Sequence, residues 1–291
     1  MSESDRSIRR SLHRHVSALA VEIGPRPALV GHGLLEAERY IRGAFADAGL
    51  PVEDQPYEYF GRKVANLIAV PPHAGTRPYY LIAAHYDSVP GTPGADDNAS
   101  AVAVMLTLAE RLRRPPVPLR FAAFTLEEPP AFMTRHQGSR AFVRAARRHG
   151  PKVKGAIVLE MVGYTAPEQH YPFILKWVGY PARGDFIGVI ANWRSRPLAR
   201  AVAHGLRRNP DLPVETLSVP LNGWPLPATR LSDHASFWDA GWPALMITDT
   251  AFMRNPNYHR PSDRIETLDF DFMTELVKGL EFAVEELGGL R

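Results

Sequence analysis

Histidine and carboxylate residues follow four short apolar segments of this sequence, and side chains of these two types bind divalent metals. They are His85 after residues 79–84, Glu127 and Glu128 after 119–125, Glu160 after 153–159, and Asp249 after 242–248. The sequence contains no cysteine, so a metal must be held by nitrogen and oxygen ligands. Such ligands suit catalytic zinc or a related divalent ion. The pattern therefore indicates a metal-dependent reaction.

Two further residues, Asp96 and His259, extend this set beyond the three protein ligands that one catalytic zinc ion takes. Two histidines and three carboxylates fit two metals that share a bridging carboxylate. We assign the bridge to Asp96, because it lies on a short loop at the start of a predicted helix, whose dipole favours negative charge. His85, Asp96 and Glu160 are expected to hold one metal. Asp96, Glu128 and His259 are expected to hold the other.

The adjacent Glu127 and Glu128 need different roles, because neighbouring residues at the end of a strand point in different directions. We assign Glu128 as a metal ligand and Glu127 as the general base that takes a proton from metal-bound water and passes it to the leaving group. Asp87 lies two residues after His85 and is expected to orient its imidazole. Asp263 is expected to orient the imidazole of His259 in the same way.

The apolar segments predict strands that alternate with helices, which is typical of an open α/β sheet covered by helices on both faces. In such sheets ligands bind at the carboxyl ends of the strands, where the candidate residues stand. Further strands are predicted at 64–70, 185–191 and 214–218. Helices are predicted at 6–23, 33–49, 98–113, 138–149, 195–208, 232–240 and 269–287.

Length and composition predict one domain over residues 1–291, with residues 1–50 as an N-terminal helical segment packed on it. Hydrophobic residues make up 45% and charged residues 22%, near the averages of soluble proteins. The net charge of +3 is too small to indicate a nucleic-acid surface. No apolar run has the length of a membrane span and no secretory signal is visible, so we predict a cytoplasmic protein without membrane contacts. The sequence predicts no oligomeric state.

The ordered motifs resemble the co-catalytic zinc exopeptidases of the bacterial leucyl aminopeptidase type. The resemblance extends from Val64 to the C-terminus. It rests on His85-Tyr-Asp87-Ser-Val-Pro, Gly94-Ala-Asp96-Asp97-Asn98-Ala-Ser, Glu127-Glu128, Glu160-Met-Val-Gly163, Ser232-Asp233-His234 and Tyr258-His259. It implies a phosphorylase/hydrolase-like, three-layer αβα fold with a mixed, mostly parallel sheet. It also implies two zinc ions and removal of N-terminal residues from a peptide substrate.

Three positions depart from the pattern of that family. Glu160 stands where aspartate is common and is one methylene longer. The segment between Glu128 and residues 138–139 is longer than in many members. Thr229 stands where many members carry a tyrosine that stabilises the tetrahedral intermediate, and Arg230 or His234 are candidates to replace it. These differences bear on substrate polarity, pocket shape and stabilisation of the oxyanion.

Three other functions share parts of this pattern. A glutaminyl-cyclase-like enzyme uses the same scaffold, usually with one zinc. A carboxypeptidase or dipeptidase would pair a terminal carboxylate with Arg230 or Arg254. A non-catalytic binding module is the third, and the intact ligand set argues against it. We favour an aminopeptidase in which Glu127 and Glu160 hold the free α-amine, with a preference for a large apolar first residue.

Overall fold

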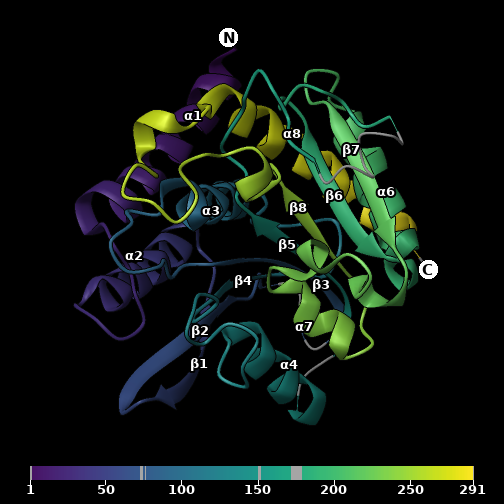
Figure 1. Ribbon diagram of the computed structural model, residues 1–291. Coiled ribbons are helices and arrows are strands. Elements are labelled where there is room, and N and C mark those ends of the chain that lie inside the picture. The colour runs from purple at the N-terminus through teal and green to yellow at the C-terminus, as the bar shows by residue number, and fades with distance from the viewer. Residues whose placement is uncertain (1, 73–74, 76, 150–151, 172–178, 291) are drawn as a thin grey trace.

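The computed structural model describes residues 2–72, 75, 77–149, 152–171 and 179–290. In this part of the chain, strands form one eight-stranded sheet in the order β1-β2-β4-β3-β5-β8-β6-β7 (Figure 1). The strands are β1 (Val52–Tyr59), β2 (Arg62–Ala69), β3 (Tyr79–His85), β4 (Leu119–Phe124), β5 (Val153–Glu160), β6 (Ile187–Asn192), β7 (Val214–Val219) and β8 (Ala244–Thr248). Strands β4, β3, β5 and β8 are parallel, and β6 and β7 run parallel to each other but antiparallel to β8. The sheet is therefore mixed.

Helices cover both faces of the sheet (Figure 1). One face carries α1 (Glu3–Val16), α2 (Gly33–Asp47), α3 (Ala101–Arg111), α6 (Arg196–Arg207) and α8 (Phe270–Glu286). The other face carries α4 (Gly138–His149) and α7 (His234–Asp239). Two π-helical segments adjoin these helices, Ser17–Ile23 after α1 and Ala95–Ser100 before α3. Short 3-10 helices span Trp193–Ser195, Leu221–Gly223, Pro227–Arg230, Ala251–Met253, Ile265–Thr267 and Leu287–Gly289.

The two faces have separate hydrophobic cores. The larger core surrounds α3, whose residues 101–109 are all buried because the helix lies between the sheet and the outer helices α1 and α8. A helix that is apolar on every side is stable only in such a position. The smaller core contains Phe124 of β4, Phe142 of α4 and Phe237 of α7, with ring centroids 5.5 to 6.3 Å apart. Both layers of helices thus pack against the central strands.

The predicted α/β fold with a mixed, mostly parallel sheet between helices is confirmed. The predicted strands and helices lie close to their predicted bounds, whereas β1 was not predicted. Of its eight residues, Tyr59 alone is buried, and Glu53, Asp54, Pro56 and Glu58 are poor strand formers. Edge strands commonly have such a composition, because one side has no neighbouring strand.

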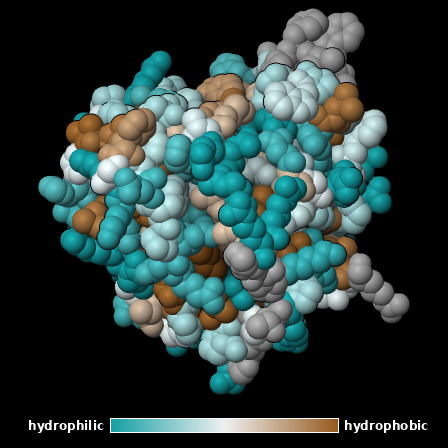
Figure 2. Space-filling view, turned by 90° about the horizontal axis from the view of Figure 1, so that it is seen from below, coloured by the Kyte–Doolittle hydropathy of each residue, from teal (hydrophilic) through white to brown (hydrophobic). Residues whose placement is uncertain are grey.

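The described part of the chain has no helix that is both long enough and apolar enough to cross a membrane. Figure 2 shows one face of the molecule, where hydrophilic residues predominate and apolar residues form small separate patches. Small, separate apolar patches of this kind are normal on protein surfaces.

Candidate metal centre

The candidate residues meet at one edge of the sheet because β4, β3 and β5 are adjacent and parallel. His85 is the last residue of β3, and Glu160 is the last residue of β5. Glu127 and Glu128 follow β4 after Leu126, whose φ of 56° turns the chain. The carboxyl ends of parallel strands lie together, so residues distant in sequence become neighbours here.

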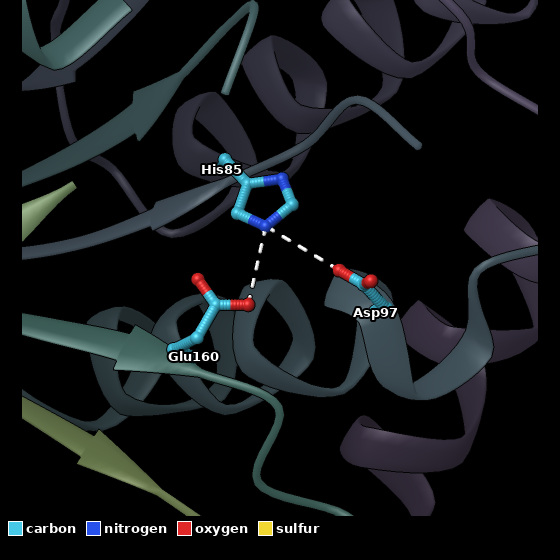
Figure 3. Close-up of side chains that lie close together, drawn as sticks. All are labelled: His85, Asp97 and Glu160. Atoms are coloured by element: carbon cyan, nitrogen blue, oxygen red, sulfur yellow. Dashed lines mark hydrogen bonds and ion pairs between the residues drawn. The ribbon is translucent and has the colours of Figure 1, made fainter. Parts of the chain in front are cut away.

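A first group of potential ligands consists of His85, Asp97 and Glu160 (Figure 3). Nε2 of His85 lies 3.4 Å from Oε1 of Glu160 and 3.5 Å from Oδ1 of Asp97. All three side chains are buried. Each offers one ligand atom, and these atoms lie within 4.8 Å of one another.

A second group consists of Asp97, Glu128 and His259. Nε2 of His259 lies 3.2 Å from Oδ2 of Asp97 and 3.4 Å from Oε2 of Glu128. Asp97 belongs to both groups, and it directs one carboxylate oxygen to each histidine. This is the geometry of a carboxylate that bridges two cations.

The assignment of the bridge to Asp96 is wrong in this geometry. Oδ1 of Asp96 accepts a hydrogen bond from the amide of Gly163 at 2.9 Å, and Oδ2 accepts one from Asn255 at 2.7 Å. Its carboxylate is therefore held on the side away from the histidines. The cause is the backbone of Asp97, whose φ of −102° and ψ of 87° depart from the helical region and send the two adjacent side chains to different places.

Asp263 holds the turn that carries Asp97, and it does not orient the second histidine as expected. Its Oδ1 and Oδ2 accept hydrogen bonds from the amides of Asp96 and Asp97 at 2.8 and 3.1 Å. One carboxylate that accepts from two successive amides fixes the backbone of a turn.

Arg26 supports the same turn from the N-terminal part of the chain. Its buried guanidinium donates to the carbonyl oxygens of Pro93 and Gly94, which precede the turn. It also donates to the carbonyl oxygens of Leu19, Gly24 and Tyr86. These bonds satisfy buried carbonyls in three segments at once.

Asp87 positions the two glutamates as well as lying beside His85. Its two oxygens accept hydrogen bonds from the amides of Glu127 and Glu128 at 3.0 and 2.9 Å. Its Oδ1 lies 3.4 Å from Nδ1 of His85, as a carboxylate that orients an imidazole would. Asp87 is fully buried, so both functions depend on a side chain without access to water.

Glu127 lies at the centre but belongs to neither ligand group. Its Oε2 is 3.9 Å from Nε2 of His85, and its side chain is buried. Burial raises the pKa of Glu127 well above its usual value, and the charge of His85 opposes this shift. Further increases come from the charges of Glu160 and Glu128.

The charges of this centre fit divalent cations. Burial and, to a smaller extent, the charge of Asp97 together raise the pKa of Glu128 to about 8. Burial lowers the pKa of His259, but Asp97 and Glu128 outweigh this effect and raise it to about 10. Within the described residues, Oε1 of Glu128 is buried without a hydrogen-bond partner. Buried carboxylates that repel one another and histidine nitrogens that face them form a donor set suited to zinc.

The Ser232-Asp233-His234 motif lies at the start of α7 and supports the centre from the face of the sheet that carries α4 and α7. The hydroxyl of Ser232 donates to Oε2 of Glu160 at 2.6 Å, and Oδ1 of Asp233 accepts from Gln137 at 3.0 Å. His234 is buried against Trp238, and its Nε2 lies 2.8 Å from the carbonyl oxygen of Thr229. Ser232 thus holds Glu160 in place, whereas Asp233 and His234 form their hydrogen bonds to residues outside the two ligand groups.

Arg230 is engaged elsewhere, although it was a candidate for pairing with a substrate carboxylate or for replacing the tyrosine of the family. Its guanidinium donates to the carbonyl oxygen of Asn222 and to Oδ1 of Asp239, at 2.6 and 2.7 Å. It also lies 4.1 Å from the ring centroid of Trp224. The hydroxyl of Thr229 donates to the carbonyl oxygen of Leu226 at 2.8 Å.

Tyr258 is a site residue to which sequence reasoning assigned no role. Its ring stacks on that of His259, with centroids 3.8 Å apart. Burial raises the pKa of its phenol, and the nearby charges of Asp97 and Glu128 raise it further. The phenol therefore stays protonated and remains a hydrogen-bond donor beside the carboxylates. Its position directly before a ligand candidate was the available signal.

An apolar pocket of about 90 Å³ adjoins Glu160. This space is large enough for several water molecules or for one side chain of a ligand. Its walls are mostly aromatic and aliphatic, including Phe186, Ile190, Leu217, Leu226, Met246 and Phe252. A pocket in this position is suited to receive part of a substrate bound at the centre.

Relatives of known sequence support the similarity seen in the motifs. The uncharacterized protein YfbL of Escherichia coli is 38% identical over 284 residues, which cover 92% of this chain and 85% of the relative. Leucine aminopeptidase 1 of Trichoderma harzianum is 26% identical over 258 residues, which cover 82% of this chain. The chain spans only 58% of the length of that aminopeptidase.

Solved structures share the fold. The zinc aminopeptidase BSAP of Bacillus subtilis superposes with a TM-score of 0.74 at 16% identity, over 96% of this chain and 95% of that one. The glutaminyl cyclase of Tannerella forsythia superposes with a TM-score of 0.70 at 18% identity, over 95% of this chain and 97% of that one. Enzymes with different reactions therefore use this scaffold.

The family model described as Peptidase family M28 matches residues 66–281, which is most of the chain and includes both ligand groups. The resemblance to the co-catalytic zinc exopeptidases is thus confirmed, and this chain belongs to peptidase family M28.

Proposed function

We propose that the chain is a zinc aminopeptidase that binds two metal ions. His85, Asp97 and Glu160 would hold one ion, and Asp97, Glu128 and His259 the other. The observation that carries the proposal is the carboxylate of Asp97, which presents one oxygen to each histidine. Membership in a peptidase family supports the reaction class, and the donor set of nitrogen and oxygen atoms supports zinc.

The residues around the ligands have distinct parts in the proposed reaction. When bound, zinc supplies Lewis-acid polarisation of the scissile carbonyl and makes water more acidic. Glu127 takes a proton from the attacking water and gives it to the amine that leaves. Glu127 and Glu160 accept hydrogen bonds from the α-ammonium of the substrate. The phenol of Tyr258 donates a hydrogen bond to the carbonyl oxygen as negative charge develops there.

Replacement of Glu127 by glutamine tests the base directly. Glutamine keeps the shape of the side chain but cannot accept a proton, so kcat should fall by about 100- to 10,000-fold. Metal content should stay the same, because Glu127 lies outside both ligand groups. Glu128→Gln is the matched control and should lose metal. Loss of metal in Glu127→Gln would show that the two roles are reversed.

Blocking the ends of the substrate tests which terminus is cut. An N-acetylated peptide should be cleaved at least about tenfold more slowly than the free peptide, because the contact to the α-amine is lost. Equal rates, with loss of activity on C-terminal amidation, would indicate a carboxypeptidase instead. A metal content near one ion per chain in the active protein would favour a cyclase-like enzyme, whose fold this chain shares.

A further inference from the structure

A row of paired residues crosses the sheet from Glu160 to a second glutamate, Glu215. Glu160 of β5 pairs with Thr248 of β8, Thr248 pairs with Gly188 of β6, and Gly188 pairs with Glu215 of β7. Paired residues on neighbouring strands direct their side chains to the same face. Three strand spacings place the Cα atoms of the two glutamates about 14 Å apart. All four residues line the apolar pocket.

The middle of this row forms the low floor of a trough. Gly188 has no side chain, and a Cβ atom at this position would stand 3.3 Å from the carbonyl oxygen of Thr248 and would protrude from the floor. The neighbouring row consists of Met246, Ile190 and Leu217, which pair in the same register and form an apolar wall. The trough therefore leads from the metal centre to Glu215 along apolar surface.

The carboxylate of Glu215 lacks a polar partner in the part of the chain that the structure describes. The side chain is half-buried on the edge strand β7, and within the described residues it makes no hydrogen bond or ion pair. The guanidinium of Arg254, which stacks on the pocket residue Phe186, donates instead to Gln169 and to the carbonyl oxygen of Tyr164. A carboxylate that faces an apolar cavity without a partner is best stabilised by a cation.

We propose that Glu215 binds the cationic end of the first side chain of the substrate, so that peptides beginning with lysine or arginine are preferred. An extended lysine side chain spans about 6 Å, and the hydrogen bonds at the two ends of the ligand, each about 3 Å long, cover much of the remaining distance along the row. The apolar stem contacts the walls of the trough, as an apolar first residue would. This inference rests on the proposed aminopeptidase function and specifies its substrate class.

Amides of lysine and of norleucine test the assignment, because norleucine has a similar stem without the charge. The wild-type protein should favour the lysine amide in kcat/KM. In Glu215→Gln, kcat/KM for the lysine amide should fall by about tenfold or more, since a charge-assisted contact is lost. The value for the norleucine amide should change by less than about twofold, which also shows that the variant is folded.

The exposed Asp211 provides a matched control, because Asp211→Asn removes the same charge four residues earlier and outside the pocket. Its ratio of lysine to norleucine activity should equal that of the wild type. A wild-type ratio that persists in Glu215→Gln overturns the role of Glu215 and leaves the aminopeptidase proposal intact. A wild-type protein that does not favour the lysine amide would also overturn the role of Glu215 and leave the aminopeptidase proposal intact.

If neither amide is hydrolysed, the aminopeptidase proposal fails, and binding of the free amino acids decides the role of the pocket. Calorimetry of the metal-loaded protein should then show tighter binding of lysine than of norleucine, with the difference lost in Glu215→Gln. Equal binding of the two amino acids would overturn the inference.

Discussion

Asp96 and Asp97 are neighbours in the sequence, yet their carboxylates have different partners. Asp97 faces both histidines, whereas Asp96 is bound by Gly163 and Asn255. Asp97→Asn should therefore reduce metal content from about two ions per chain to one or none. Asp96→Asn changes the same charge and should retain both ions. Elemental analysis after dialysis against metal-free buffer measures this difference.

The reverse result, with metal lost from Asp96→Asn and kept in Asp97→Asn, would restore the bridge predicted from the sequence. Sequence reasoning identified the other four ligand candidates because each follows an apolar strand or lies in a recognisable motif. It chose Asp96 instead of the adjacent Asp97, because the correct choice depends on the non-helical φ and ψ of Asp97, which the sequence does not show. That conformation is fixed by the carboxylate of Asp263, which accepts hydrogen bonds from the amides of Asp96 and Asp97 and lies 166 residues from Asp97 in sequence.

His234 should make stability depend on pH. Burial lowers the pKa of His234 to about 4, while in the unfolded chain the pKa is near its usual 6.5. As pH falls below 6.5, the unfolded state therefore gains a proton that the folded state does not. The free energy of unfolding should fall by about 2 kcal/mol between pH 7.5 and 5 from this group alone.

Urea unfolding of metal-free protein at several pH values isolates this contribution when the wild type is compared with His234→Gln. The variant has no titrating group at this position, so its stability should fall less steeply with decreasing pH. Parallel curves for the two proteins would contradict a neutral, buried His234.

Helices α6 and α8 approach each other closely at Gly205. A Cβ atom added there would stand 2.3 Å from Cα of Ala283, so the helix backbones would have to separate. Gly205→Ala should destabilise the protein by about 1–3 kcal/mol through overpacking. Gly43→Ala, on an exposed position of α2 with nothing within 4 Å of the added Cβ, should instead stabilise it by up to about 1 kcal/mol.

Chemical denaturation of both variants measures the two changes in the free energy of unfolding. An unchanged free energy for Gly205→Ala would mean that the α6–α8 contact can open to admit a methyl group.

The strands and helices also show what the sequence pattern alone predicts. Long apolar runs gave β3, β4 and β5 and hence the edge where the ligands meet. The polar strand β1 and the close approach at Gly205 depend on neighbours that only the folded chain supplies.

Arg26 connects distant parts of the whole molecule, because it joins the N-terminal helices to the turn that carries Asp97. Lysine has fewer donors and no planar fork, so Arg26→Lys leaves several buried carbonyl oxygens unpaired. We expect the free energy of unfolding to fall by at least about 2 kcal/mol. Metal affinity, measured by competition with a chelator, should also fall because the turn is less firmly held.

Arg39→Lys, at an exposed position of α2, is the control and should change neither quantity. An Arg26→Lys protein with wild-type stability and metal affinity would show that the N-terminal segment does not support the centre. Destabilisation with unchanged metal affinity would limit the role of Arg26 to folding.

The turn at Asp97 is held by Arg26 from one side and by Asp263 from the other, and this has a consequence for how the protein is made. During synthesis, β3 and its histidine leave the ribosome long before His259 and Asp263 are translated. Until then the nascent chain lacks the second histidine and the carboxylate that fixes the turn. Contacts between such distant segments form slowly, because a long loop must close first. The complete set of candidate ligands is therefore expected to come together late in folding, after the C-terminal part of the chain has been made.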